Sequence, residues 1–206
     1  MRFVLASASP ARLSVLRAAG IEPSVVVSGV DEDAVAASLT DPSPTELVTA
    51  LAVAKAEAVV ETVAGTHGDA VVVGCDSMLS VGGELVGKPG EPEIARKRWA
   101  QLAGGTADLL TGHAVLRVEG GTLTRRTTGS QTTKVHFAEP TPEELDAYIA
   151  TGEPLVVAGA FTLDARGGWF IEGLEGDPSS VIGISLPLTR RLLAEVGVSV
   201  VDLWAS

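Results

Sequence analysis

Residues 5–21 read LASASPARLSVLRAAGI and predict a strand that runs into a Ser-Pro turn and then into a helix. Ser9 suits the N-cap of that helix, and Pro10 suits its first position, where a missing N–H costs nothing. The start of such a helix carries unpaired N–H groups and a positive dipole end, with Ser7 and Arg12 beside it. The pattern therefore indicates either an anion site or an ordinary capped helix with a solvent-facing arginine.

The composition points to an α/β protein. Of the 206 residues, 46% are hydrophobic but only 4% are aromatic, so the core must consist mainly of Val, Leu, Ile and Ala, as in strands buried on both faces. The length allows one large domain or two small ones, and we favour a single domain over residues 1–206. The formal charge of -11 argues against a nucleic-acid polymer or an acidic membrane as partner, but a few focused cations can still bind a nucleotide.

Cysteine usage and hydropathy bear on the compartment. Cys75 is the only cysteine, so no disulfide can form within the chain, and a thiolate zinc site is disfavoured. The first residues lack the apolar run of a secretory signal, and no segment reaches the roughly 18 apolar residues of a membrane span. We therefore expect a soluble, cytoplasmic protein.

The apolar patterns predict alternating strands and helices around an acidic turn at residues 31–33. We expect strands at 3–6, 24–28, 70–74 and 198–201, a hairpin at 82–83, and two long strands within 107–137 joined by a turn at 119–122. A Gly-rich β region is expected at 158–173. The expected helices are one closed by Gly20, then 44–64 with a Ser43–Glu46 capping box, 91–102, 142–150 and 186–196.

Three charged residues stand at informative positions. On the helix at 44–64, the row at spacing four is apolar except for Lys55, which indicates either a cleft residue or a lysine whose stem leads to water. The run at 70–74 leads directly to Asp76, as in a central strand that delivers a carboxylate at its carboxyl end. Lys88 precedes Pro89, which favours an extended and locally rigid backbone.

These side chains suit a polyphosphate bound with a divalent ion. Basic and hydroxyl groups bind phosphate oxygens, and carboxylates hold Mg²⁺ or Mn²⁺ or orient an attacking water. The candidate anion binders are Ser7, Arg12, Lys55 and Lys88, and the candidate carboxylates are Asp31, Glu32 and Asp76. By composition alone, residues 31–33 also fit a solvated turn.

Several other chemistries are disfavoured. The chain has no Walker A motif, no G-x-G-x-x-G after the first strand and no G-x-S-x-G nucleophile elbow. His67, His113 and His136 are not spaced as a metal cluster. Cys75 fits a small buried strand residue better than a nucleophile.

Five ordered motifs and a closing segment resemble the Maf family of nucleoside triphosphate pyrophosphatases. SASPAR at 7–12 is similar to the family's S-x-S-P-R-R signature, and VSGVDED at 27–33 to its acidic motif. LAVAKAEAV at 51–59, GCDSMLSV at 74–81 and VGKP at 86–89 match its lysine, aspartate and second lysine motifs. EGDPSSVIGISLP at 175–187 is similar to its closing motif, so the resemblance covers nearly the whole chain.

The resemblance implies a fold and a reaction. The implied fold is an elongated mixed sheet flanked by helices, with two lobes around a deep cleft, as in the inosine triphosphate pyrophosphatases. The implied reaction is attack of water on the α-phosphorus of a nucleoside triphosphate with Mg²⁺ or Mn²⁺, which yields the monophosphate and diphosphate and removes unwanted nucleotides.

The family's motifs also imply residue roles. Asp76 would be the general base or water-positioning carboxylate, and Asp31 would support it as a metal or water ligand. The phosphate-binding residues would be Ser7, Arg12, Lys55 and Lys88. The base pocket would include Phe161 and Asp164.

Two departures from the family pattern limit this transfer. The first arginine of the signature is Ala11, which leaves Arg12 to carry more of the phosphate binding. The pyrimidine-selective branch has Gln where this chain has Asp164, and the C-A-G-S-F pattern of another branch is also absent. Since a carboxylate selects hydrogen-bond donors, the preference of that branch for dTTP and UTP is not carried over to this chain.

Two other functions are compatible with the same motifs. One is a nucleotide-binding regulator of septum formation and cell division with little turnover, and the other is a phosphatase that releases orthophosphate. The intact Asp76, Lys55 and Lys88 favour the pyrophosphatase, because binding alone requires no water-activating carboxylate. The sequence leaves open whether the chain forms a homodimer.

Overall fold

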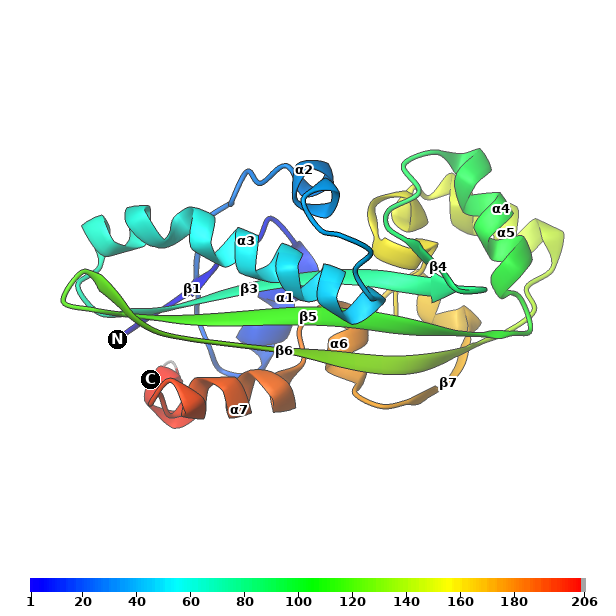
Figure 1. Ribbon diagram of the computed structural model, residues 1–206. Coiled ribbons are helices and arrows are strands. Elements are labelled where there is room, and N and C mark those ends of the chain that lie inside the picture. Colours follow the sequence, from blue (N-terminus) through cyan, green and yellow to red (C-terminus); the bar gives the residue numbers. More distant parts are fainter. Residues whose placement is uncertain (205–206) are drawn as a thin grey trace. The chain divides into compact units, whose positions relative to one another are not determined.

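Parallel and antiparallel strands combine in a seven-stranded sheet in the computed structural model, which describes residues 1–204 (Figure 1). The strand order is β2-β1-β3-β5-β6-β7, and β4 pairs with β3. The strands are β1 (Arg2–Leu5), β2 (Ser24–Val25), β3 (Ala70–Val81), β4 (Glu84–Val86), β5 (Thr106–Glu119), β6 (Thr122–Phe137) and β7 (Ile171–Glu175). A mixed α/β sheet flanked by helices confirms the predicted fold class.

The α-helices are α1 (Pro10–Ala18), α2 (Glu32–Ala37), α3 (Pro44–Thr66), α4 (Pro92–Leu102), α5 (Pro142–Ala150), α6 (Pro178–Ile182) and α7 (Leu186–Glu195). Short 3-10 helices are η1 (Glu153–Val156), η2 (Ala158–Ala160), η3 (Arg166–Phe170) and η4 (Val200–Leu203). The chain divides into two compact units, so the single domain expected over residues 1–206 stays a prediction. Unit 1 comprises Met1–Asp76, Thr111–Gln131 and the chain from Gly183 onward, and unit 2 comprises Ser77–Leu110 and Thr132–Ile182.

In unit 1 the sheet lies between helices on both faces, because successive side chains of a strand point to opposite sides. Val4 and Val72 pack against α3 on one face. Leu5 and Val73 face the cluster formed with α1 and α7 on the other. Figure 1 shows α3 and α7 on opposite sides of these strands. Burial on both faces explains the continuous apolar run at 70–73.

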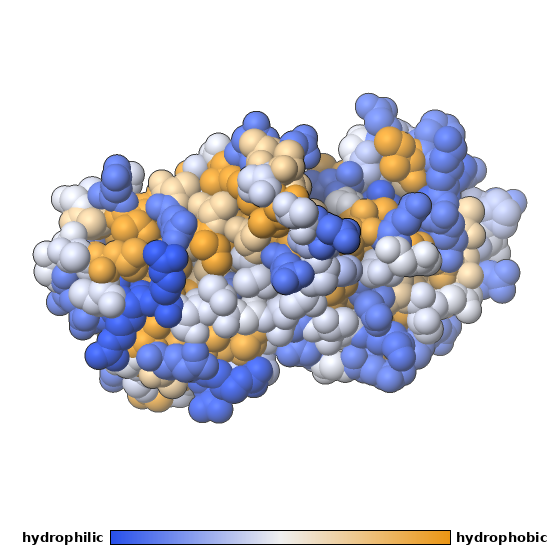
Figure 2. All heavy atoms as spheres, viewed as in Figure 1, coloured by the Kyte–Doolittle hydropathy of each residue, from blue (hydrophilic) through white to orange (hydrophobic). Residues whose placement is uncertain are grey.

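Unit 2 has a core of its own, centred on Trp99 of α4. The indole ring meets Phe137, Tyr148 and Phe170 with their centroids 5.7, 6.1 and 5.9 Å away, and its Nε1 donates a 2.8 Å hydrogen bond to the Ala160 carbonyl. The outward side of α4 is largely hydrophilic (Figure 2). The helix therefore has one face fixed in an aromatic core and another open to solvent.

The predicted caps are confirmed. The Ser9 hydroxyl accepts a hydrogen bond from the Arg12 N–H at the start of α1. Ser43 and Glu46 form the reciprocal capping box of α3. The predicted turn of the β3–β4 hairpin also forms, with Gly82 and Gly83 both at positive φ.

Several predicted elements are wrong at their ends or in type. Strand β2 stops at Val25, and the acidic residues 31–33 begin helix α2 instead of forming a turn, because Asp31 caps it. Strand β3 continues past Asp76 to Val81, since it pairs with β4 beyond the segment that pairs with β1. The last predicted strand, at 198–201, does not form, and its second half belongs to the 3-10 helix η4.

The predicted Gly-rich β region at 158–173 consists mostly of 3-10 turns, and only the segment from Ile171 onward is a strand. Gly159 and Ala160 have φ values of 77° and 64°, which no strand accommodates. Farther along, a Cβ on Gly167 would lie 2.6 Å from the Thr162 backbone. The chain therefore folds tightly on itself here.

Within residues 1–204, no helix is both long enough and apolar enough to span a lipid bilayer.

Candidate active site

The site in unit 1 lies at the carboxyl ends of parallel strands. β1 pairs in parallel with β2 through Leu5 and Val25, and with β3 through Leu5 and Val73. Ser7 follows β1, and Asp76 lies within β3 just beyond the segment that pairs with β1, at the same edge of the parallel part of the sheet. This edge is where open α/β sheets bind ligands.

The first turn of α1 holds Arg12 close to Ser7. The Ser7 hydroxyl accepts hydrogen bonds from the Ser9 N–H and from Nη1 of Arg12, both at 3.1 Å. Nε of Arg12 donates a 2.7 Å hydrogen bond to the carbonyl of Gly183, a residue of the closing motif. Neutral acceptors thus orient the guanidinium at the start of the helix.

Lys55 lies between two carboxylates. Its Nζ is 2.5 Å from Oδ1 of Asp76 and 2.7 Å from Oε1 of Glu32. The side chains of Lys55 and Asp76 are only 12% and 8% exposed, whereas that of Glu32 is 52% exposed. The lysine that interrupts the apolar row of α3 is therefore largely buried and ion-paired.

Two glycines let α3 approach the sheet closely enough for this contact. A Cβ on Gly74 of β3 would lie 2.3 Å from the Ala52 carbonyl oxygen, and one on Gly112 of β5 would lie 2.2 Å from that of Val48. Because strand side chains alternate, Gly74 and Asp76 face the same side as Val72, toward α3. The absence of a side chain at position 74 thus brings Lys55 down onto the carboxylate of Asp76.

The second oxygen of Asp76 is a buried acceptor without a donor. Oδ2 has no hydrogen-bond partner within residues 1–204. Such a group costs about 1–3 kcal/mol unless a ligand or water satisfies it. An acceptor of this kind, at the carboxyl end of parallel strands, fits a metal ion or an attacking water.

Cys75, beside Asp76, packs on the opposite face of the strand. Burial raises the pKa of its thiol to about 11, despite the opposing effects of the Arg12 and Lys55 charges. A buried thiol with a raised pKa is a poor nucleophile at neutral pH. The expectation of a small buried strand residue is confirmed.

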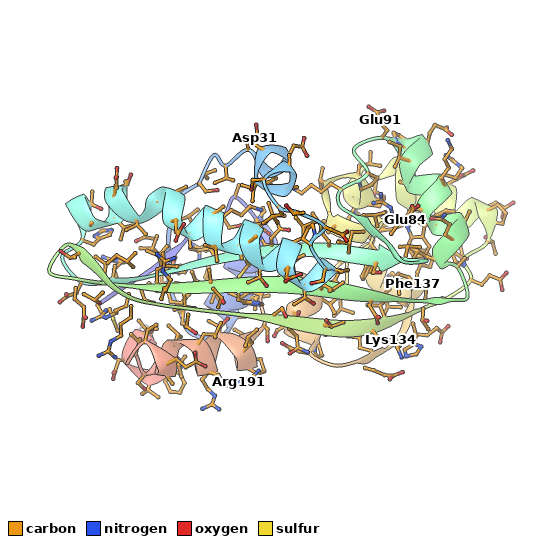
Figure 3. All side chains as sticks on the ribbon, in the orientation of Figure 1. Asp31, Glu84, Glu91, Lys134, Phe137 and Arg191 are labelled. Carbon is orange, nitrogen blue, oxygen red and sulfur yellow. The ribbon has the colours of Figure 1, made fainter. Side chains whose placement is uncertain are left out.

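The carboxylates of Asp31 and Glu32, at the start of α2, have different partners. Figure 3 labels Asp31 beside α2. Its carboxylate accepts a 3.0 Å hydrogen bond from the Ala34 N–H and so caps the helix. Glu32, the next residue, is the one whose carboxylate contacts Lys55. The sequence named both residues, and only the fold distinguishes their contacts.

The predicted residues Lys88, Phe161 and Asp164 all belong to unit 2. Lys88 is exposed between β4 and α4, and Asp164 is exposed between η2 and η3. Phe161, by contrast, is only 4% exposed, and its ring packs edge-on against Phe137 with centroids 5.0 Å apart. It therefore anchors its segment in the core, and Asp164 is the member of the predicted base pocket that solvent reaches.

Two further residues of unit 2 were not predicted from the sequence. Arg98 donates a 2.6 Å hydrogen bond from Nη1 to the Gly87 carbonyl, beside Lys88. Glu153 accepts hydrogen bonds from the Thr162 hydroxyl at 2.6 Å and the Gly167 N–H at 3.0 Å, at the two ends of the segment that contains Asp164. No motif marks either residue, because the partners are distant in sequence or are backbone groups.

Comparisons with known proteins give one answer. The profile of the Maf-like protein family matches residues 2–196. A protein of Saccharopolyspora erythraea named nucleoside triphosphate pyrophosphatase is 72% identical over 205 residues, 99% of this chain and 97% of that protein. Proteins of the same name from Nocardia farcinica and Rhodococcus erythropolis are 64% and 62% identical over 202 and 205 residues. Each of these matches covers 98% of this chain, with 95% and 96% of the respective relative. This chain belongs to the family of Maf-like proteins.

Proposed function

We propose that this chain is a nucleoside triphosphate pyrophosphatase that converts its substrate into the nucleoside monophosphate and diphosphate. The observation that carries the proposal is the Asp76 carboxylate, with Oδ1 paired to Lys55 and Oδ2 buried without a hydrogen-bond partner among residues 1–204. Relatives that are 62–72% identical are named nucleoside triphosphate pyrophosphatase, which supports the same activity.

In the proposed reaction, a water molecule attacks the α-phosphorus. The water oxygen forms a bond to phosphorus while the bond from that phosphorus to the bridging oxygen breaks, and diphosphate leaves. Oδ2 of Asp76 orients the water and accepts its proton. Lys55 keeps the carboxylate in place and offsets negative charge that develops on the phosphate oxygens.

The remaining basic residues bind phosphate in this proposal. Arg12 presents a guanidinium whose donors match phosphate oxygens, and Ser7 orients it. Lys88 is proposed as a further phosphate ligand because of its VGKP motif. Asp164 is proposed to contact the base.

The donor set fits Mg²⁺ or Mn²⁺. Within residues 1–204, no three His, Cys, Asp or Glu side chains gather into a metal-binding cluster. Asp76 and Glu32 nevertheless offer hard carboxylate oxygens, and Mg²⁺ in nucleotide enzymes binds one or two carboxylates together with water and substrate phosphates. We propose the carboxylates of these two residues as the protein ligands. When bound, the ion would neutralise phosphate charge.

The test is product analysis with a panel of ordinary and modified nucleoside triphosphates, in Mg²⁺ and in Mn²⁺. Diphosphate and orthophosphate are quantified separately for the wild type and for Asp76→Asn. We expect diphosphate as the product and a fall of about 10² or more in kcat for the variant.

Other products would contradict the proposal. Orthophosphate alone would indicate a phosphatase, and nucleotide binding without any product would indicate a regulator. Near-native rates for Asp76→Asn would move the role of water activation to another carboxylate.

A further inference from the structure

The VGKP loop of unit 2 is held by its backbone at two points. The Gly87 carbonyl accepts hydrogen bonds from Nη1 of Arg98 at 2.6 Å and from the Gly159 N–H at 3.3 Å. The Gly90 N–H donates to the Leu155 carbonyl at 2.9 Å. Between these points Pro89 is buried while Lys88 is exposed. The loop is thus fixed with its lysine directed to solvent.

Arg98 is only partly buried by the core on which its helix packs. The neighbouring residue, Trp99, is fully buried, and burial lowers the pKa of the Arg98 guanidinium. Arg96, two residues earlier, pairs with Asp146 at 2.5 Å. Arg98 forms no ion pair with any residue between 1 and 204. A partly desolvated cation without a carboxylate is unfavourable unless another anion binds it.

The donors of Arg98 are mostly unused. A guanidinium carries five N–H donors, and the structure engages one of them, with the carbonyl of the peptide that joins Gly87 to Lys88. The remaining donors belong to a planar group that matches the oxygens of a phosphate, and Lys88, the residue after Gly87, adds an exposed positive charge. Arg98 and Lys88 have no carboxylate partner among residues 1–204, which is unusual for two neighbouring cations in a chain of net charge -11.

We propose that Arg98 is a phosphate-binding residue that acts beside Lys88 in unit 2. The proposal rests on the proposed function, because it takes the anion to be a phosphate group of the nucleotide or of the diphosphate product. The bond to Gly87 orients the guanidinium and leaves its other donors for phosphate oxygens.

The experiment measures binding of inorganic diphosphate to the full chain by titration calorimetry. The variants are Arg98→Ala, Arg98→Gln and Lys88→Ala. Lys97→Ala is the matched control, because it removes the same charge from an exposed position of the same helix. We expect each change at Arg98 or Lys88 to weaken binding about tenfold, equivalent to about 1.4 kcal/mol. Lys97→Ala should stay within about twofold of the wild type.

Arg98→Gln separates phosphate binding from support of the loop. Its amide can still donate to the Gly87 carbonyl but carries no charge. If Arg98 only supports the loop, Gln restores diphosphate binding where Ala does not, and that result overturns the proposal. Thermal unfolding of each variant confirms that the chain is folded.

The outcome also distinguishes this proposal from the proposed function. If folded Arg98→Gln hydrolyses nucleotide to diphosphate and binds diphosphate as tightly as the wild type, the proposed function is sustained and the role of Arg98 is overturned. Weakened diphosphate binding in that variant, with no hydrolysis by the wild type, would sustain the anion site and overturn the function. No diphosphate binding by the wild type would overturn the role of Arg98.

Discussion

The ammonium of Lys55 lies 2.5 Å from Oδ1 of Asp76, so the two oxygens of that carboxylate have different roles. Oδ1 is held by the ion pair, so Oδ2 is fixed in direction, and no group of residues 1–204 donates a hydrogen bond to it. Removing either partner of such a buried pair costs about 3–5 kcal/mol in other proteins. The pair therefore serves both the stability of unit 1 and the orientation of the proposed general base.

The contacts of Asp31 and Glu32 predict different effects of their amide variants. Glu32→Gln removes the second negative charge on Lys55 and a proposed metal ligand, so we expect kcat to fall about 10-fold or more and the Mg²⁺ requirement to rise. Asp31→Asn keeps the helix cap, because Asn caps helices about as well as Asp, and it should retain near-native kcat. Steady-state kinetics over a range of Mg²⁺ concentrations compares the two. The reverse order of effects would assign the metal to Asp31.

Gly74→Ala should destabilise unit 1 and reduce activity together. The new Cβ would lie 2.3 Å from a backbone oxygen of α3, so the helix must move away and carry Lys55 with it. We expect a loss of about 3 kcal/mol in the free energy of unfolding. Gly65→Ala is the control, because position 65 lies on the same helix with no atom within 4 Å of the new Cβ. It should stabilise the chain by about 0.5–1 kcal/mol. Urea denaturation measures both, and equal effects would contradict the argument.

Glu153 should make the stability of unit 2 depend on pH. Its partial burial acts to raise the pKa, but hydrogen bonds from Thr162 and the N–H groups of Gly167 and Arg166 outweigh that effect and leave the pKa below 4.5. A lowered pKa contributes stability above the ordinary value and loses it as the pH falls through the native value. We expect Glu153→Gln to cost about 1–2 kcal/mol at pH 7 and less below about pH 4.5.

Thermal unfolding from pH 3 to pH 8 tests this dependence, with Glu172→Gln as the control at an exposed glutamate. If the difference in stability between the wild type and Glu153→Gln stays constant with pH, the charge of Glu153 is not the cause of the lost stability.

Asp164→Gln should change which bases are accepted. A carboxylate accepts hydrogen bonds only, whereas an amide also donates them, so the variant should gain rate on bases that present acceptors. The ratio of kcat/KM values for dTTP or UTP relative to purine nucleotides is the measurement. An unchanged substrate profile would exclude Asp164 from base selection.

Most of unit 1 could be predicted from the sequence because its signals are local. Ser9, Pro10 and the Ser43–Glu46 box mark helix starts within four residues, and their caps form as expected. The carboxyl ends of parallel strands also converge by topology, which brings Ser7 and Asp76 to one edge. The pairing of Lys55 with Asp76 could not be predicted from the sequence. It depends on the close approach of α3 to β3 at Gly74, which no local pattern encodes.

Unit 2 was harder to predict. The segment from 158 to 170 reads as β by composition, yet Ala160 takes a positive φ and Gly167 packs against the backbone of Thr162. Tertiary contacts decide such a segment. The contact of Arg98 could not be predicted for a similar reason, because nothing in the sequence relates an arginine on a helix to the carbonyl of Gly87.

The seclusion of Cys75 makes this chain a convenient background for site-specific labelling. Because the sole native thiol is buried and stays protonated at neutral pH, a maleimide dye would attach almost only to a cysteine introduced at the surface. Ala165 is exposed beside Asp164, so Ala165→Cys would place a fluorophore on the loop proposed to contact the base. Such a dye would report nucleotide binding in real time with little background from the native thiol.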